Sequence, residues 1–261
     1  MSLPLAGRRI LVTRAHTQAA KLSEGLRALG ADAVEVPVIE ICPPESYEAL
    51  DAALRRLDSY DWLLFTSMNA VVPFHVRAIE LGVSLSNLKP QIAAIGKATA
   101  QALEMLVHLK VALIPSEYVA ESLVAALKGQ IAGKRVLLVR AAVARDVVPD
   151  GLRSAGATVD VVDAYRNVLP FAAPSQLRQA FADGLDAAAF TSSSSVTHLA
   201  DAAHAAGVPF PLKGVLAVSI GPITSKTLRE CGWTPAAEAV PHDIPGLIAA
   251  VEKALGNSVR G

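Results

Sequence analysis

The chain repeats itself at a domain-sized offset, and this internal duplication limits its possible folds more than any other feature. The first half of the sequence matches the second in the same order, while the offset drifts only from 126 to 124 residues. Two copies of more than a hundred residues each are too few and too long for a solenoid. The matching pairs are GRRILVTRA from 7 with GKRVLLVRA from 133, DWLLFTSMNAV from 61 with DAAAFTSSSSV from 186, IGKATAQAL from 95 with IGPITSKTL from 220, and ESLVAAL from 121 with PGLIAAV from 245.

Within each copy, short β-type runs alternate with amphipathic helical segments. RRILVTR is followed by QAAKLSEGLRALG and then by AVEVPVIEI. Such alternation predicts parallel sheets built from βα units. Gly30 and Gly156 end equivalent helical patterns, where a C′ glycine is expected. The predicted fold is α/β, with two parallel-sheet domains that arise from the duplication and are joined by a two-stranded connection.

The domain borders follow from two proline-punctuated strand segments, 37–44 and 164–171, which lie inside the repeats and not at their ends. Two crossings between the same two domains explain that placement. We therefore expect a discontinuous domain of residues 1–37 and 172–261, a second domain of residues 42–164, and connecting strands at 38–41 and 165–171. A single division near residue 130 is the alternative.

Composition excludes several classes of function. Twenty-four basic and 24 acidic residues cancel, which gives no reason to expect nucleic acid or an anionic membrane as partner. No apolar run approaches the roughly 18 residues of a membrane span, and the N-terminal segment lacks the features of a signal peptide. The two cysteines and six histidines show no metal-ligand or disulfide spacing. We expect a cytoplasmic protein with no bound metal.

Polar residues and glycines follow four apolar runs, two in each copy. In parallel sheets such turns lie at the carboxyl ends of the strands, where ligands bind. Hydroxyl groups and free backbone N–H groups at a helix N-terminus together form a receptor for carboxylate or phosphate. Helix capping by the same side chains is the alternative. The candidates are Ser67 and Asn69, Ser192 and Ser194, Gly96, Lys97 and Thr99, and Gly221 and Thr224; which serine of 192–195 faces a ligand is left open.

Two arginines and one tyrosine complete the set of candidates. Arg14 and Arg140 end equivalent strands and suit bidentate binding of carboxylates, although structural ion pairs would also explain them. Lys97 has Pro222 as its counterpart, so its role is not shared by both copies. Tyr165 lies in the second crossing segment, where its hydroxyl would be a neutral proton donor unless the ring simply packs in a core.

The full ordered set of motifs resembles the uroporphyrinogen-III synthase family from end to end. It runs VTR…GLRALGA, P-x-I-E-I, DWLLFTSxNAV, AAIGKATA, AESL, GKRVLLVR, DxYR, FTSSS and IGPxT. The resemblance implies a cyclising lyase of tetrapyrrole (porphyrin, heme) biosynthesis. Its substrate is hydroxymethylbilane, which carries eight carboxylates; the product, uroporphyrinogen III, forms with loss of water and inversion of the last pyrrole through a spiro intermediate.

The resemblance also implies roles for individual residues. Tyr165 matches the family's tyrosine and is cast as the general acid that assists loss of hydroxide. Ser67, Thr99, Ser194 and Thr224 match hydroxyl positions that bind carboxylates. We expect no cofactor, a monomer, and at most transient contact with hydroxymethylbilane synthase.

Two other functions remain possible on the residues alone. The turns would also suit a duplicated sugar-phosphate transferase, although no catalytic acid or base is evident at a strand end of one copy. In a two-domain small-molecule binding protein the chain would likewise cross twice between the domains. Closure on a ligand without any product would distinguish the second of these from an enzyme.

Overall fold

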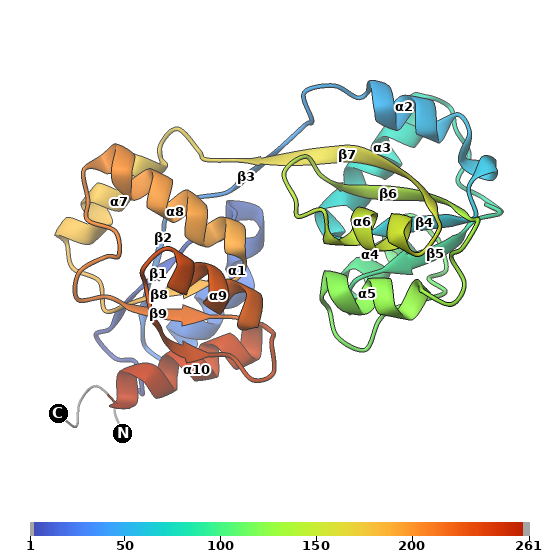
Figure 1. The fold of residues 1–261 in the computed structure, drawn as a ribbon. Helices are drawn as coiled ribbons and strands as arrows, with labels where there is room; N and C mark the ends of the chain where they lie inside the picture. Colours follow the sequence, from blue (N-terminus) through green and yellow to red (C-terminus); the bar gives the residue numbers. More distant parts are fainter. Residues whose placement is uncertain (1–2, 258–261) are drawn as a thin grey trace. The chain divides into compact units, whose positions relative to one another are not determined.

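The computed structural model describes residues 3–257 and divides the chain into two compact units (Figure 1). Unit 1 combines the residues up to Glu40 with those from Val168 onward, and unit 2 comprises Ile41–Asn167. Each unit contains one five-stranded sheet flanked by helices. The predicted α/β class with parallel sheets is confirmed.

The sheet of unit 1 has the order β10-β9-β8-β1-β2, and all its neighbouring strands are parallel. Its apolar core is divided between the two faces: α1 and α10 pack on one, and α7, α8 and α9 on the other. Its elements are β1 (Arg9–Val12), α1 (His16–Ala28), β2 (Asp32–Glu35), α7 (Ala173–Ala182), β8 (Ala187–Phe190), α8 (Ser193–Ala206), β9 (Leu216–Ser219), α9 (Pro222–Glu230), β10 (Pro235–Glu238) and α10 (Ile244–Asn257).

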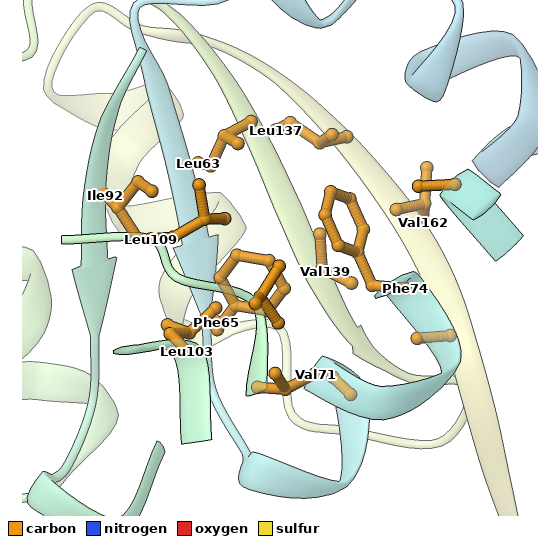
Figure 2. Close-up of a cluster of buried hydrophobic side chains, with 14 of the residues drawn as sticks. Leu63, Phe65, Val71, Phe74, Ile92, Leu103, Leu109, Leu137, Val139 and Val162 are labelled. Atoms are coloured by element: carbon orange, nitrogen blue, oxygen red, sulfur yellow. The ribbon is translucent and has the colours of Figure 1, made fainter. Parts of the chain in front are cut away.

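The sheet of unit 2 has the order β3-β7-β6-β4-β5. Helices α2, α3 and α4 cover one face, where Phe65 and Phe74 meet edge to face at 5.1 Å, and α5 and α6 cover the other (Figure 2). The elements are β3 (Glu40–Cys42), α2 (Glu48–Leu54), η1 (Leu57–Ser59), β4 (Trp62–Phe65), η2 (Met68–Ala70), α3 (Val71–Glu80), β5 (Gln91–Ala94), α4 (Lys97–Leu106), α5 (Ala120–Leu127), β6 (Arg135–Ala141), α6 (Val147–Ser154) and β7 (Thr158–Val168).

The duplication is preserved down to the pairing of single residues, yet each sheet mixes the two copies. Unit 1 takes β1 and β2 from the first copy and β8 to β10 from the second, whereas unit 2 takes β4 and β5 from the first and β6 and β7 from the second. Trp62 pairs with Gln91 as its counterpart Ala187 pairs with Leu216. Because the register repeats, any side chain of one unit can be compared with its counterpart in the other.

Glycines end two equivalent helices as their positions in the sequence predict. Gly30 follows α1 with a φ of 92°, and Gly156 follows α6 with a φ of 90°. This left-handed conformation is costly for residues with a Cβ, which explains why both copies carry glycine there. Among residues 3–257, no helix is long and apolar enough to cross a membrane.

Candidate active site

Tyr165 reaches the polar turn after β4 because β7 contains a β-bulge. Arg140 pairs with Asp163 but the next residue of β6, Ala141, pairs with Tyr165, so Ala164 is an extra residue in the ladder. Side chains alternate between the faces of a strand, and one inserted residue reverses the alternation. Ala164 and Tyr165 consequently both join the core cluster beneath α2, α3 and α4.

The hydroxyl of Tyr165 lies beside two of the predicted site residues. Its pKa responds to the side chains of Ser67 and Asn69, and the Ser67 hydroxyl accepts the backbone N–H of Asn69 at 3.2 Å. The ring is 5% exposed. Burial raises the pKa of Tyr165, and the hydrogen bonds from Ser67 and Asn69 offset part of that rise. The phenol is therefore a protonated, positioned donor at neutral pH.

The two glycine turns begin helices whose first N–H groups have no side-chain cap. Gly96 precedes α4 and Gly221 precedes α9, and neither helix end receives a side-chain hydrogen bond. Thr99 and Thr224 are 5% and 4% exposed, and neither hydroxyl has a hydrogen-bond partner among the described residues. Uncapped N–H groups at the positive end of a helix dipole suit a carboxylate.

An aromatic ring lies over each of these glycines, a feature that the motif analysis missed. A Cβ on Gly96 would come within 3.4 Å of the Tyr118 ring, and one on Gly221 would come within 3.4 Å of the His242 ring. The same repeat offset that relates ESLVAAL to PGLIAAV relates Tyr118 to His242. The signal was present in the sequence, because the offset of 124 residues aligns these two rings.

The serine-rich turn after β8 is divided between capping and open hydroxyls. Ser192 and Ser195 form a capping box at the start of α8, in which the Ser192 hydroxyl accepts the N–H of Ser195 at 3.2 Å. Helix capping, the alternative raised for these turns, therefore accounts for Ser192. Ser194 aligns with Asn69, which contacts Tyr165 in unit 2. The side-chain hydroxyl of Ser194 has no partner among the described residues.

Arg14 and Arg140 have different surroundings, despite their equivalent positions. The guanidinium of Arg140 donates to Asp146 at 2.9 Å, so the structural ion pair considered for it is present. Arg14 has no ion pair among residues 3–257; its Nε lies 3.4 Å from the side-chain oxygen of Gln18. Burial lowers the pKa of Arg14. A half-buried cation without a carboxylate partner is costly, and an anionic ligand would relieve that cost.

Two further predictions concern charge and metals. Lys97 is the exposed first residue of α4, at the helix end whose N–H groups have no side-chain cap. Within the described part of the chain, no three His, Cys, Asp or Glu side chains are grouped so that they would hold a metal ion. The groups predicted to bind anions are therefore backbone N–H, hydroxyl, guanidinium and ammonium groups.

Comparison with known proteins identifies the family. The family model described as uroporphyrinogen-III synthase HemD matches residues 20–249. The chain belongs to the uroporphyrinogen-III synthase family. It is 37% identical to the uroporphyrinogen-III synthase of Synechococcus elongatus over 96% of both chains. It is 34% identical to the putative uroporphyrinogen-III synthase of Methanothermobacter thermautotrophicus, over 95% of this chain and 99% of that relative.

Solved structures support the fold of this synthase family member. A uroporphyrinogen III synthase from Thermus thermophilus superposes with a TM-score of 0.68 at 20% identity, covering 96% of this chain and all of that one. The uroporphyrinogen-III synthetase from Helicobacter pylori gives a TM-score of 0.60 at 20% identity, over 97% of this chain and all of that one. At such identities the likeness concerns the fold alone.

Proposed function

We propose that this chain converts hydroxymethylbilane to uroporphyrinogen III, with loss of water and inversion of the last pyrrole ring. Membership of the synthase family supports the reaction. The observation that carries the mechanism is the burial of Tyr165 beside Ser67 and Asn69 at the carboxyl end of β4. That end of a parallel sheet is where ligands bind in open α/β folds.

Tyr165 acts as the general acid in this proposal. The bond between the terminal CH2 group and its hydroxyl breaks as the phenol gives its proton to the departing oxygen, and water leaves. The electron pair of the adjacent pyrrole nitrogen replaces the broken C–O bond, and loss of the N–H proton to water leaves the neutral azafulvene, which the substituted carbon of the last pyrrole attacks. Because burial raises the pKa of Tyr165, the phenol keeps its proton at neutral pH until the leaving group takes it.

Each unit, taken by itself, offers groups that suit substrate carboxylates, most of them uncharged. In unit 2 these are the N–H groups of the Gly96 turn with Thr99 and Lys97, and in unit 1 the Gly221 turn with Thr224, Ser194 and Arg14. Removal of one charge-assisted hydrogen bond costs roughly 1.5–3 kcal/mol, so each contact contributes a distinct share of the affinity. Arg140 is a weaker candidate because Asp146 already holds its guanidinium.

Orientation matters more than acceleration in this reaction. The linear tetrapyrrole closes without a catalyst to the uninverted isomer, so the enzyme has to hold the last ring where its substituted carbon attacks. Rigidly placed receptors for the carboxylates would supply that control. A monomer, a cytoplasmic location and transient delivery of substrate by hydroxymethylbilane synthase also belong to this proposal.

The proposal is tested against its alternatives by following hydroxymethylbilane directly. The substrate is generated in situ and its disappearance is compared with and without the purified chain. Faster consumption with formation of a cyclic product supports the synthase. Stoichiometric binding that protects the linear substrate from closure would instead identify a binding protein, and unchanged consumption would remove hydroxymethylbilane as the substrate.

A further inference from the structure

Unit 2 contains a cavity at the edge of its sheet opposite the candidate active site. The cavity has a volume of about 430 Å³ and lies between the second half of α3, the loop before β5 and the loop after α4. Ile79, Leu85, Leu109 and Ile92 supply apolar walls, and Leu109 and Ile92 can be followed at one side of the core in Figure 2. The loop before β5 lies at the amino end of that strand, whereas the polar turns follow the carboxyl ends of strands. The volume falls in the range of small-molecule sites.

The duplication shows that the same space is filled in unit 1. Gln91 and Leu216 are counterparts because they hold the same place in the two strand pairings, so Leu85, six residues before Gln91, corresponds to Phe210. Phe210 and Trp233 pack edge to face at 5.3 Å in unit 1, and Trp233 also meets Phe190 at 5.5 Å. Protein interiors are close-packed. Where smaller side chains stand in place of these rings, the space is therefore expected either to collapse or to bind a ligand.

The loop after α4 identifies the counterpart of Trp233. Gly232 is the left-handed residue that ends α9, with a φ of 80°, and His108 is the left-handed residue that ends α4, with a φ of 58°. The next residue is Trp233 in unit 1 and Leu109 in unit 2. Leucines 85 and 109 thus replace the two aromatic residues, and both leucines line the cavity.

Backbone strain in the described chain concentrates at this cavity. Asn87 and His108 are the two non-glycine residues with positive φ among residues 3–257, and both line it. A non-glycine residue in this conformation costs free energy, and such residues cluster at ligand-binding sites. The equivalent position in unit 1 is Gly232, which adopts a positive φ without this strain. Unit 2 therefore keeps an imidazole where glycine would be more stable.

The polar lining is basic. His75, His108 and Lys110 contribute to it together with Ser86 and Asn87, and no Asp or Glu does. Neither His108 nor Lys110 forms an ion pair within the described residues. The buried Nδ1 of His75 has no hydrogen-bond partner in the described chain, and an unmet buried polar atom is costly. These groups favour a ligand that carries negative charge and accepts hydrogen bonds.

We propose that this cavity binds a small aromatic anion, with one ring or two fused rings and a carboxylate. The ring takes the space that Phe210 and Trp233 fill in unit 1, against Leu85 and Leu109. The carboxylate lies towards His108 and Lys110. The cavity lies within unit 2 and stands apart from the reaction at the turn after β4.

The probe is indole-3-acetate, with indole as its neutral counterpart. Isothermal titration of the full chain should give one site for indole-3-acetate and roughly fivefold weaker binding of indole, the size expected for a partly exposed charge contact. Protein-observed NMR should place the shifts at the α3 and α4 loops. Absence of binding at millimolar probe, or equal affinity for the two compounds, would overturn the proposal.

The chain supplies its own matched variants, because unit 1 shows which residues fill or neutralise the space. Leu109→Trp should reduce the affinity for indole-3-acetate at least tenfold. Leu85→Phe is the second variant, to be used if the Leu109→Trp protein does not fold. His108→Gly combined with Lys110→Thr, the residues found in unit 1, should abolish the preference for indole-3-acetate over indole. Unchanged affinity in a folded Leu109→Trp or Leu85→Phe variant contradicts the assignment, as does a preserved preference in the double variant.

Discussion

Replacing Arg14 with Met is expected to stabilise the protein while weakening its binding of substrate. Arg14 is half-buried at the carboxyl end of β1, and burial lowers its pKa. Its Nε makes one long contact of 3.4 Å to Gln18, and it has no ion pair among the described residues. Methionine retains the apolar part of the side chain and removes the charge.

The size of the effect follows from the missing partner. Burying an unpaired charge costs several kcal/mol in a fully buried site, and the partial exposure of Arg14 reduces this to about 1 kcal/mol. Arg14→Met should therefore raise the free energy of unfolding by about 1 kcal/mol. Loss of one charge-assisted hydrogen bond to a substrate carboxylate should raise KM about tenfold or more, with a smaller change in kcat.

The equivalent arginine of the other copy provides the matched control. Arg140 donates to Asp146 at 2.9 Å, so Arg140→Met removes a formed ion pair and should lower the free energy of unfolding by up to about 1 kcal/mol. Urea denaturation of the wild type and both variants, followed by circular dichroism, measures the stabilities. Steady-state kinetics with hydroxymethylbilane generated in situ measures KM and kcat.

The two readouts separate a binding residue from a structural one. If Arg14→Met destabilises the protein, Arg14 has a partner that its surroundings do not show, and the reasoning from the unpaired charge is wrong. If the variant is more stable but its KM is unchanged, the charge does not serve the substrate. Stabilisation together with a raised KM is the combination that the account requires.

Further predictions concern Tyr165, Tyr60 and Gly246. Tyr165→Phe should lower kcat about a hundredfold, more than any single Ser or Thr substitution, and steady-state turnover tests this. Burial and then Asp160 raise the pKa of Tyr60 to about 12. Its contribution to the free energy of unfolding is therefore complete below about pH 10 and is lost as pH rises towards 12. Urea unfolding should show that Tyr60→Phe loses less free energy of unfolding than the wild type across this pH window. Gly246→Ala drives a Cβ into the Pro241 carbonyl oxygen and should lower the free energy of unfolding by about 2 kcal/mol or more, measured by urea unfolding.

The fold was predictable from the internal duplication of the sequence. A repeated register of strands, with Gly30 and Gly156 ending equivalent helices, leaves few arrangements other than two related parallel sheets. That each sheet takes strands from both copies is a property of the three-dimensional pairing. The sequence pointed to it only through the proline-punctuated segments inside the repeats.

The site was less predictable because it depends on single-residue irregularities. Tyr165 meets Ser67 and Asn69 through the bulge at Ala164, and no turn residue or proline marks that bulge in the sequence. The motif likewise gave Ser192 and Ser194 equal weight. Only the capping box shows that the Ser192 hydroxyl is engaged.

The ion-pair partners of the two arginines also could not be predicted from the sequence. Arg14 and Arg140 occupy equivalent positions in the repeat, which predicts the same role for both. The segment after β6 places Asp146 against Arg140, whereas the segment after β1 gives Arg14 no carboxylate within the described residues. Ion pairs between a strand and its following loop depend on loop conformation, which periodicity does not specify.

The most direct test measures the isomer composition of the product for the wild type, Tyr165→Phe and Tyr60→Phe. Tyr60 is the matched control, since it is also buried and its hydroxyl donates to Asp160 at 2.7 Å, away from the turn after β4. Products from in situ hydroxymethylbilane are oxidised and separated as isomers I and III. We expect predominantly isomer III from the wild type and Tyr60→Phe, and from Tyr165→Phe a slow formation of isomer III overtaken by spontaneous isomer I. Isomer I alone from folded wild-type protein, or Tyr165→Phe as fast as the wild type, would contradict it.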